Sequence, residues 1–268
     1  MISEIDRYAS LSSPIHRWDP RLRLVSIFTL IFSVILLYNL QLVIIGMIFA
    51  IVLTGISKIP FSFVLSRMKL VFIFVIPFFV ILPFTFMNTD TGVEIASFGG
   101  ITLSYRGIEY AVFAAMIVLK ALVAVMLIFP MIGTSRMDIT IKALEGLHLP
   151  NKLVQMFAFT YRYIFVLDDE FVRTDRALAA RGFKKRGNMY TLTTVSKAIA
   201  MLFVKSYERA DRVFNAMRSK GYTGTIATLH EFHARRQDWI NTAIVAGFAI
   251  LLQVAATSNT FSATGGFI

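Results

Sequence analysis

Two short stretches of the chain combine a small residue, a cation and a glycine. They are Ala180-Arg181-Gly182 and Ser219-Lys220-Gly221. A cation so placed can donate charge-assisted hydrogen bonds to carboxylates or carbonyls of another surface, and small neighbours let that surface approach the backbone. The same residues also suit a helix end, where glycine takes a left-handed conformation and a cation faces the negative end of the helix dipole. Helix cap and docking tip are therefore both open interpretations of each stretch.

The helix expected before Gly221 has one apolar stripe, because its apolar residues recur at spacings of three, four and seven. Its members are Ile199, Leu202, Phe203, Ala210, Val213, Phe214 and Met217. The opposite face is polar and carries Lys205, Glu208, Arg209, Arg212 and Arg218. Glu208 and Arg212 are spaced for an ion pair that supports this helix.

Two further helices are predicted before it. Asp168, Asp169 and Glu170 suit the first turn of a helix that runs to Ala180, where their charge complements the positive helix end. Gly182 would stop that helix. A shorter helix is expected from Met137 to Leu147, ahead of Pro150.

The composition places these helices beside a membrane. Of 268 residues, 56% are hydrophobic and 16% charged, and the mean hydropathy of +0.68 is too high for a soluble globular domain. The fold class is therefore an all-α, polytopic membrane bundle. The chain has no cysteine, which excludes disulfides, thiolate metal sites and cysteine nucleophiles. The polar first twenty residues predict no cleavable signal peptide.

Five segments are apolar enough to be predicted as spanning helices. They are Leu22–Leu40, Leu42–Ile56, Leu70–Phe86, Tyr110–Gly133 and Trp239–Ala256. Basic loops stay cytoplasmic, so the N-terminus, residues 57–69 and residues 134–238 are expected inside, and the acidic loop at 87–110 outside. This divides the chain into a membrane domain of four spans (1–133), cytoplasmic coupling helices (134–238), and a last span with its tail (239–268). The net charge of +11 thus has a topological cause and needs no nucleic acid.

One apolar segment is ambiguous. Leu153–Leu167 is long enough to suggest a sixth span, but it contains Arg162 and would move the densest basic cluster outside. We interpret it as a helix packed across the inner ends of the bundle.

Other residues that could do chemistry are few. Lys120 lies near the middle of the fourth span; it either contacts a membrane partner or snorkels to the interface. His230 and His233 stand among basic residues and are interpreted as solvated surface. The predicted spans contain no acidic residue or histidine, and the chain has no phosphate-cradling loop, so no metal site, cofactor or ATP site is expected.

The residues around both tips resemble the T component (EcfT/CbiQ family) of energy-coupling factor ABC transporters. The resemblance rests on residues 176–183, on the run from Glu208 to Arg212, and on residues 216–222. The amino end, residues 13–24, is also similar to the segment that leads into this family's first span. The resemblance covers nearly the whole chain.

The resemblance implies a scaffold subunit in the cell membrane. It would link a substrate-binding membrane protein, the S component, to two cytoplasmic ABC ATPases. Arg181 would occupy a groove of one ATPase and Lys220 a groove of the other, while Ala180, Gly182, Ser219 and Gly221 allow close fit. The family's second motif has arginine where this chain has Lys220, and lysine lacks the planar fork of arginine. Arg218 is therefore a second candidate for that role.

The expected cargo is cobalt or nickel, because residues 4–9 resemble members dedicated to these metals. A shared T component for vitamin uptake is the alternative. A membrane enzyme would need clustered histidines and carboxylates at the inner ends of the spans, which the sequence lacks. A stand-alone transporter would need polar groups at midplane or broken, repeated halves, for which Lys120 and the prolines of the third span are the only support.

Overall fold

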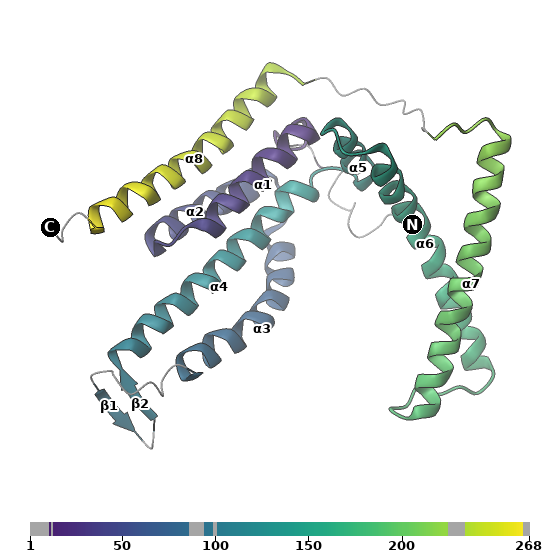
Figure 1. Cartoon of the computed structure of the whole chain (residues 1–268), viewed down its shortest axis with the longest axis horizontal. Helices are drawn as coiled ribbons and strands as arrows, with labels where there is room; N and C mark the ends of the chain where they lie inside the picture. Colours follow the sequence, from purple (N-terminus) through teal and green to yellow (C-terminus); the bar gives the residue numbers. More distant parts are fainter. Residues whose placement is uncertain (1–10, 12, 86–93, 99–100, 225–233, 265–268) are drawn as a thin grey trace. The chain divides into compact units, whose positions relative to one another are not determined.

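The structure is a computed structural model that describes residues 11, 13–85, 94–98, 101–224 and 234–264. Within these residues the chain forms eight helices and one two-stranded antiparallel hairpin (Figure 1). The elements are α1 (Pro20–Leu36), α2 (Leu40–Ile56), α3 (Phe61–Thr85), β1 (Glu94–Phe98), β2 (Ile101–Ser104), α4 (Tyr105–Ile132), α5 (Met137–Gly146), α6 (Asn151–Ala180), α7 (Met189–Ser219) and α8 (Arg236–Thr264). Residues 1–140 with 232–268 form a first compact unit, and residues 141–231 form a second.

Helix α4 is the centre of the first unit, where it contacts α1, α2 and α3, while α8 lies along α1 (Figure 1). The core between these helices consists of fully buried aliphatic side chains such as Ile27, Leu30 and Leu127. Helices α1 and α2 approach closely at Gly46, where an added Cβ would lie 3.2 Å from Val34. A larger residue at this position would therefore push the two helices apart.

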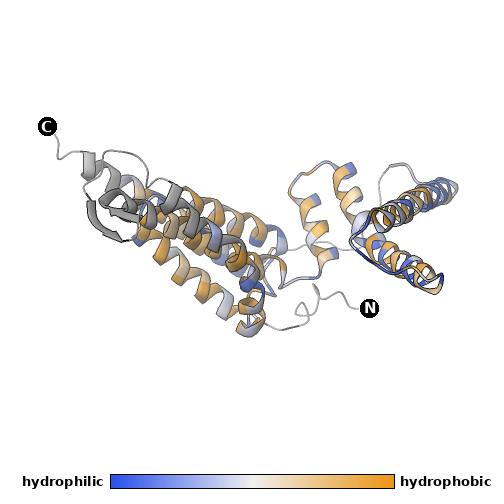
Figure 2. Cartoon of the chain, turned by 90° about the horizontal axis from the view of Figure 1, so that it is seen from below, coloured by the Kyte–Doolittle hydropathy of each residue, from blue (hydrophilic) through white to orange (hydrophobic). Residues whose placement is uncertain are grey.

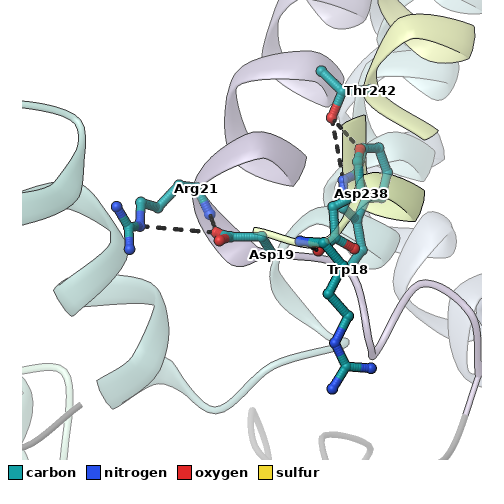
Figure 3. A network of polar contacts seen from close by, with 6 residues as sticks. Trp18, Asp19, Arg21, Asp238 and Thr242 are labelled. Atoms are coloured by element: carbon teal, nitrogen blue, oxygen red, sulfur yellow. Dashed lines mark hydrogen bonds and ion pairs between the residues drawn. The ribbon is translucent and has the colours of Figure 1, made fainter. Parts of the chain in front are cut away.

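Polar side chains fasten α8 to α1. The hydroxyl of Ser33 donates to the carbonyl of Ala249 at 2.9 Å, and the amide of Gln253 donates to the carbonyl of Ser33 at 2.8 Å. Ahead of α1, the indole N–H of the buried Trp18 donates to the Thr242 hydroxyl at 3.2 Å (Figure 3). These bonds satisfy polar groups that lipid would leave without partners, so they fix the position of α8.

The first unit has the composition of a membrane bundle, and Figure 2 shows hydrophobic residues on most sides of its helices. Among the residues that the structure describes, two stretches are long and apolar enough to cross a membrane: Val112–Ile132 within α4 and Arg236–Ser258 within α8. Helix α2 is also apolar but is shorter, with 17 residues. The predicted all-helical class is thus confirmed, whereas the number of five spans stays a prediction.

Several predicted boundaries were right and others were wrong. Helices α2 and α5 lie within two residues of their predicted bounds. Helix α3 begins at Phe61 rather than Leu70 and so includes Arg67 and Lys69, because neither glycine nor proline lies between Pro60 and Leu70. The hairpin of β1 and β2 lies within the stretch predicted as an outer loop, and it was not foreseen.

The largest correction concerns α6. The sequence predicts one helix over 153–167 and a second beginning at Asp168, but the structure has one helix of 30 residues from Asn151 to Ala180. Neither glycine nor proline occurs within it, so nothing interrupts the backbone hydrogen bonds. Asp168, Asp169 and Glu170 are therefore mid-helix residues rather than a first turn.

Candidate docking site at the ends of helices α6 and α7

Helices α6 and α7 of the second unit form an antiparallel hairpin. Near their middle, Lys205 of α7 lies 2.5 Å from the carboxylate of Glu170 of α6. Beyond the end of α7, the hydroxyl of Tyr222 donates to the side-chain carbonyl of Gln155, and the Gln155 amide donates to the carbonyl of Gly224 at 2.8 Å. The end of α7 is thus held against the start of α6.

Helix α6 ends in a Schellman motif formed by the first of the two tripeptides. Arg181 is the C-cap, and Gly182 has a φ of +81°, in the left-handed region. The Gly182 N–H donates to the carbonyl of Ala179 at 3.0 Å, and the Phe183 N–H donates to the carbonyl of Leu178 at 3.1 Å. Both bonds satisfy carbonyls that the helix end leaves open.

Helix α7 ends in the same way at the second tripeptide. Lys220 is the C-cap and Gly221 has a φ of +85°. The Gly221 N–H donates to the carbonyl of Arg218 at 3.0 Å, and the Tyr222 N–H donates to the carbonyl of Met217 at 3.0 Å. The helix-cap interpretation is therefore correct for both stretches, and each cap presents its cation at the same position.

Both caps are open to solvent. Ala180, Arg181 and Gly182 are exposed, as are Ser219, Lys220 and Gly221. A Cβ added at either glycine would meet no atom within 4 Å, so the positive φ, and not crowding within the chain, demands glycine there. The backbone of each tip thus remains accessible to another surface.

The two tips lie at opposite ends of the hairpin. The contact between Glu170 and Lys205 marks the crossing, and the antiparallel helices carry Arg181 and Lys220 away from it in opposite directions. At about 1.5 Å of rise per residue on either side of the crossing, the tips are separated by up to about 39 Å.

The cations at and near the tips have different surroundings. Within the described part of the chain, neither Arg181 nor Lys220 forms an ion pair. The guanidinium of Arg218 lies 5.9 Å from the centre of the Phe214 ring, one turn back along α7. Lys220 is thus the terminal cation of this tip, and Arg218 lies against its own helix.

Ion pairs support the hairpin behind its tips. The predicted pair between Glu208 and Arg212 forms at 3.8 Å on the exposed surface of α7. The hydrogen bond from Lys205 holds the pKa of Glu170 below its usual value. Lys185, in the connection between the helices, lies 2.9 Å from Asp175. Such exposed pairs orient side chains more than they stabilise the fold.

The apolar stripe of α7 is divided in the structure. Leu202, Val213 and Met217 are partly buried, and the latter two line a groove of about 680 Å³ that α7 forms with α6. Phe203 of the same predicted stripe is 74% exposed, and Phe214 and Ile199 are also exposed. None of the described residues of α7 is buried. The hairpin therefore has more apolar surface than its two helices cover.

Lys120 lies in α4, close to the end of α1. Its ammonium donates to the carbonyl of Ile35 at 2.9 Å and lies 5.5 Å from the centre of the Tyr38 ring. Ile35 belongs to the last turn of α1, whose carbonyls have no partner within that helix. The lysine thus caps α1 from a neighbouring helix.

Arg23 is a structural residue that was not identified from the sequence. Its side chain is fully buried. One terminal nitrogen donates to the carbonyl of Ile15 at 3.2 Å, and the other donates to the Ser135 hydroxyl at 2.6 Å. Ser135 in turn lies 2.8 Å from the Thr140 hydroxyl. Arg23 therefore joins α1 to the segment before it and to the turn between α4 and α5.

A second polar cluster lies where the chain enters α1 and α8. The Asp19 carboxylate accepts from the Arg21 N–H at 2.9 Å and caps the start of α1 (Figure 3). The Asp238 carboxylate accepts from the Arg235 N–H at 2.8 Å at the start of α8. An aspartate just before proline or in a first helical turn is the sequence signal that could have identified both.

His230 and His233 lie outside the described residues. Among the residues that the structure does describe, no group of three or more His, Asp and Glu side chains lies together as metal ligands would.

Comparison with known proteins agrees with the resemblance noted in the sequence. The family model described as "Cobalt transport protein" (CbiQ) matches residues 11–231. Over 242 residues the chain is 24% identical to the energy-coupling factor transporter transmembrane protein EcfT of Macrococcus caseolyticus, covering 88% of this chain and 89% of that protein. It is 27% identical to the protein of that name from Bacillus subtilis, covering 82% and 84%. An uncharacterised protein of Methanocaldococcus jannaschii is also 27% identical, covering 87% and 80%. Since the family model spans most of its length, the chain belongs to the CbiQ family.

Proposed function

We propose that the chain is the transmembrane coupling subunit of an energy-coupling factor importer. In this role it links two cytoplasmic ABC ATPase subunits to a substrate-binding membrane subunit. Family membership and the energy-coupling factor names of the similar proteins support the class of transporter. The two matching helix tips support the part that this subunit plays.

The single observation that carries the proposal is the repeated cap. Two helices end in the same hydrogen-bonded motif, with an exposed cation at the C-cap and an exposed glycine after it. A stable cap presents its cation from a fixed backbone, so little entropy is lost when that cation binds a carboxylate. Arg181 and Lys220 are the proposed contacts, flanked by Ala180, Gly182, Ser219 and Gly221.

The arrangement of the tips suits a pair of ATPases. Each tip lies at its own end of the hairpin, so one subunit reaches two separate grooves. If the ATPases move relative to one another on binding ATP, the hairpin must move with them. It transmits energy only through contacts that differ between the open and closed states of the ATPases. Glu208 and Arg212 support α7 behind its tip.

In this proposal residues 134–238 are the cytoplasmic coupling region, and five helices span the cell membrane with the N-terminus inside. The excess of basic residues in the inner loops supports this orientation. The chain itself is not the enzyme of the complex, since its sequence has no loop that would cradle the phosphates of ATP.

The proposed cargo is cobalt or nickel, in line with the description of the family model. Vitamin uptake with a shared T component is the second candidate, because the similar proteins named above carry only the general energy-coupling factor name. In either case Lys120 is a secondary candidate for contact with the substrate-binding subunit, beside its bond to α1. A stand-alone transporter or a membrane enzyme remains a remote alternative.

Charge reversal at the first tip tests the docking role. In a preparation of this chain with its ATPase subunits, Arg181→Glu should release the ATPases on co-purification and leave membrane insertion unchanged. The matched control is Arg173→Glu, an exposed arginine about two turns earlier on the same helix. Equal recovery of the ATPases with both variants would contradict the role of Arg181.

The same reversal at the second tip ranks the two contacts. Lys220→Glu should weaken ATPase recovery less than Arg181→Glu, because a lysine makes no bidentate contact. If Lys220→Glu alone releases the ATPases, the proposed order of the two sites is wrong.

A further inference from the structure

A polar groove of about 640 Å³ lies at one end of the first unit, at the meeting point of three segments. The segment before α1 contributes Arg17, the turn after α2 contributes Lys58, and the start of α8 contributes Arg235. These cations are far apart in the sequence, so the fold, and not a local basic run, brings them to one groove.

The groove is positively charged. All three cations are exposed, and none of them forms an ion pair within the described part of the chain. Asp238 also lines the groove, but its carboxylate is buried and accepts the backbone N–H of Arg235 at 2.8 Å. The negative charge is thus committed to the start of α8, where the positive helix end stabilises it.

The backbone holds Lys58 in an uncommon conformation. Its φ is +56°, in the left-handed region that residues other than glycine rarely adopt. Its N–H donates to the carbonyl of Gly55 at 3.1 Å, and the preceding Ser57 N–H donates to the carbonyl of Leu53. Glycine would take this conformation with less strain, so a lysine here is consistent with a use for its side chain.

Apolar residues adjoin the cations. Ile240 lines the groove and is exposed, and its neighbour Trp239 is 61% exposed in the first turn of α8. Tryptophan is enriched at the depth of lipid headgroups, and α8 contains a candidate membrane span. The groove therefore offers cations for a phosphate together with an apolar surface for the glycerol and acyl chains.

We propose that Arg17, Lys58 and Arg235 bind the phosphate of an anionic phospholipid in the leaflet where α1, α2 and α8 meet it. The proposal rests on the membrane insertion proposed above. It goes beyond a general attraction of basic loops to the membrane, because it assigns one groove and one lipid class. A free phosphate shares the anionic chemistry but leaves the apolar side of the groove uncovered.

The fluorescence of Trp239 provides the test, because the chain has two tryptophans and the other, Trp18, is 3% exposed. The full chain is placed in phosphatidylcholine nanodiscs that contain a minor fraction of brominated lipid, either phosphatidylglycerol or phosphatidylcholine. Brominated phosphatidylglycerol should quench Trp239 more strongly at equal bromine content. Equal quenching by the two lipids would overturn the site.

Variants assign the preference to the groove. The preference for phosphatidylglycerol over phosphatidylcholine should fall about fivefold for each cation that is removed in Arg17→Gln, Lys58→Gln and Arg235→Gln. A triple variant with Lys69→Gln, Arg136→Gln and Lys184→Gln loses equal charge elsewhere and should keep the preference. Lys58→Gly is a further check, because glycine accepts the left-handed backbone and removes only the side chain. If the control triple loses the preference as much as the groove triple, general charge and not this groove is responsible.

Two further measurements distinguish a lipid site from a free-anion site and from a wrong membrane topology. Inorganic phosphate, matched in ionic strength by chloride, should leave the preference intact; if phosphate alone abolishes it, the groove takes a free anion and the lipid assignment is wrong. If brominated phosphatidylcholine does not quench Trp239 at all, the start of α8 does not reach the bilayer. The proposed membrane topology then fails, and the lipid site fails with it.

Discussion

Arg23 and Arg181 are the same residue type in opposite settings. Arg23 of the first unit is fully buried and donates to two elements beside α1. Arg181 of the second unit is exposed and forms no ion pair among the described residues. The first unit buries the guanidinium of Arg23 and bonds it to its own backbone and side chains, whereas the α6–α7 hairpin leaves the cations of its two tips exposed. A sequence position that looks basic can thus belong to the fold or to a partner, and burial separates the two.

The largest effect that this contrast predicts is the loss of stability on replacing Arg23. Arg23→Met should lower the free energy of unfolding of the first unit by about 3 kcal/mol, because the carbonyl of Ile15 and the hydroxyl of Ser135 lose a buried charged donor. Arg181→Met is the matched variant and should change stability by less than about 0.5 kcal/mol. Thermal unfolding of the detergent-purified chain measures both. Similar losses at the two arginines would refute the contrast.

Helix packing in the first unit provides the next effect. Gly46→Leu should destabilise the unit by about 2 kcal/mol, because even a Cβ there would lie 3.2 Å from Val34. Gly247→Leu on α8 is the control, since nothing lies within 4 Å of an added Cβ at that position. The unfolding temperatures of the two variants, each compared with that of the unchanged chain, measure this difference. A control as unstable as Gly46→Leu would mean that the close approach of α1 and α2 is not responsible.

In the hairpin the corresponding effect is smaller and local. Gly182→Ala or Gly221→Ala should each cost about 1 kcal/mol, because alanine is strained at these positive φ values. Gly187→Ala, in the connection between α6 and α7, has neither a positive φ nor a close neighbour and should be neutral. Hydrogen exchange should show faster opening of the last turn of α6 or α7 alone. Opening that spreads through the whole hairpin would show that the caps do more than end the helices.

The smallest predicted effect depends on pH. Lys205 lowers the pKa of Glu170 in the folded chain, so the pair stabilises the hairpin above the pKa of the unfolded state. That contribution is lost as the pH falls through the lower, folded value. Hydrogen-exchange protection near the crossing of α6 and α7 should therefore be constant above about pH 5 and decline in more acid solution. Glu170→Gln should remove this decline, and an unchanged decline would assign it to other groups.

Much of the helical architecture was predictable from sequence, because apolar runs and glycine stops are local signals. The bounds of α2 and α5, the two glycine-terminated helices and the pair of Glu208 with Arg212 followed from such signals. The acidic run at Asp168 gave a wrong helix start. A cluster of negative charge suits the first turn of a helix, but it also suits the middle of a helix that lies beside a lysine of its neighbour.

The candidate site was predictable in its residues but not in its geometry. Sequence identified Arg181 and Lys220, but it could not place the two tips at opposite ends of one hairpin, because this depends on the packing of α6 against α7. The bond from Lys120 to Ile35 and the buried contacts of Arg23 also escaped prediction. Each of these contacts joins residues that only the tertiary fold brings together, so the spacing of residues along the chain does not predict it.

The central claim is that both caps contact the ATPase subunits, and site-specific cross-linking tests it most directly. The chain has no cysteine, so Ala180→Cys or Ser219→Cys introduces a single reactive site beside each cation without removing it. With a photoreactive maleimide attached, both variants should cross-link to ATPase subunits in the assembled complex, whereas Arg173→Cys on the same hairpin should not. Cross-linking of Arg173→Cys alone, or of none of the three, would contradict the account.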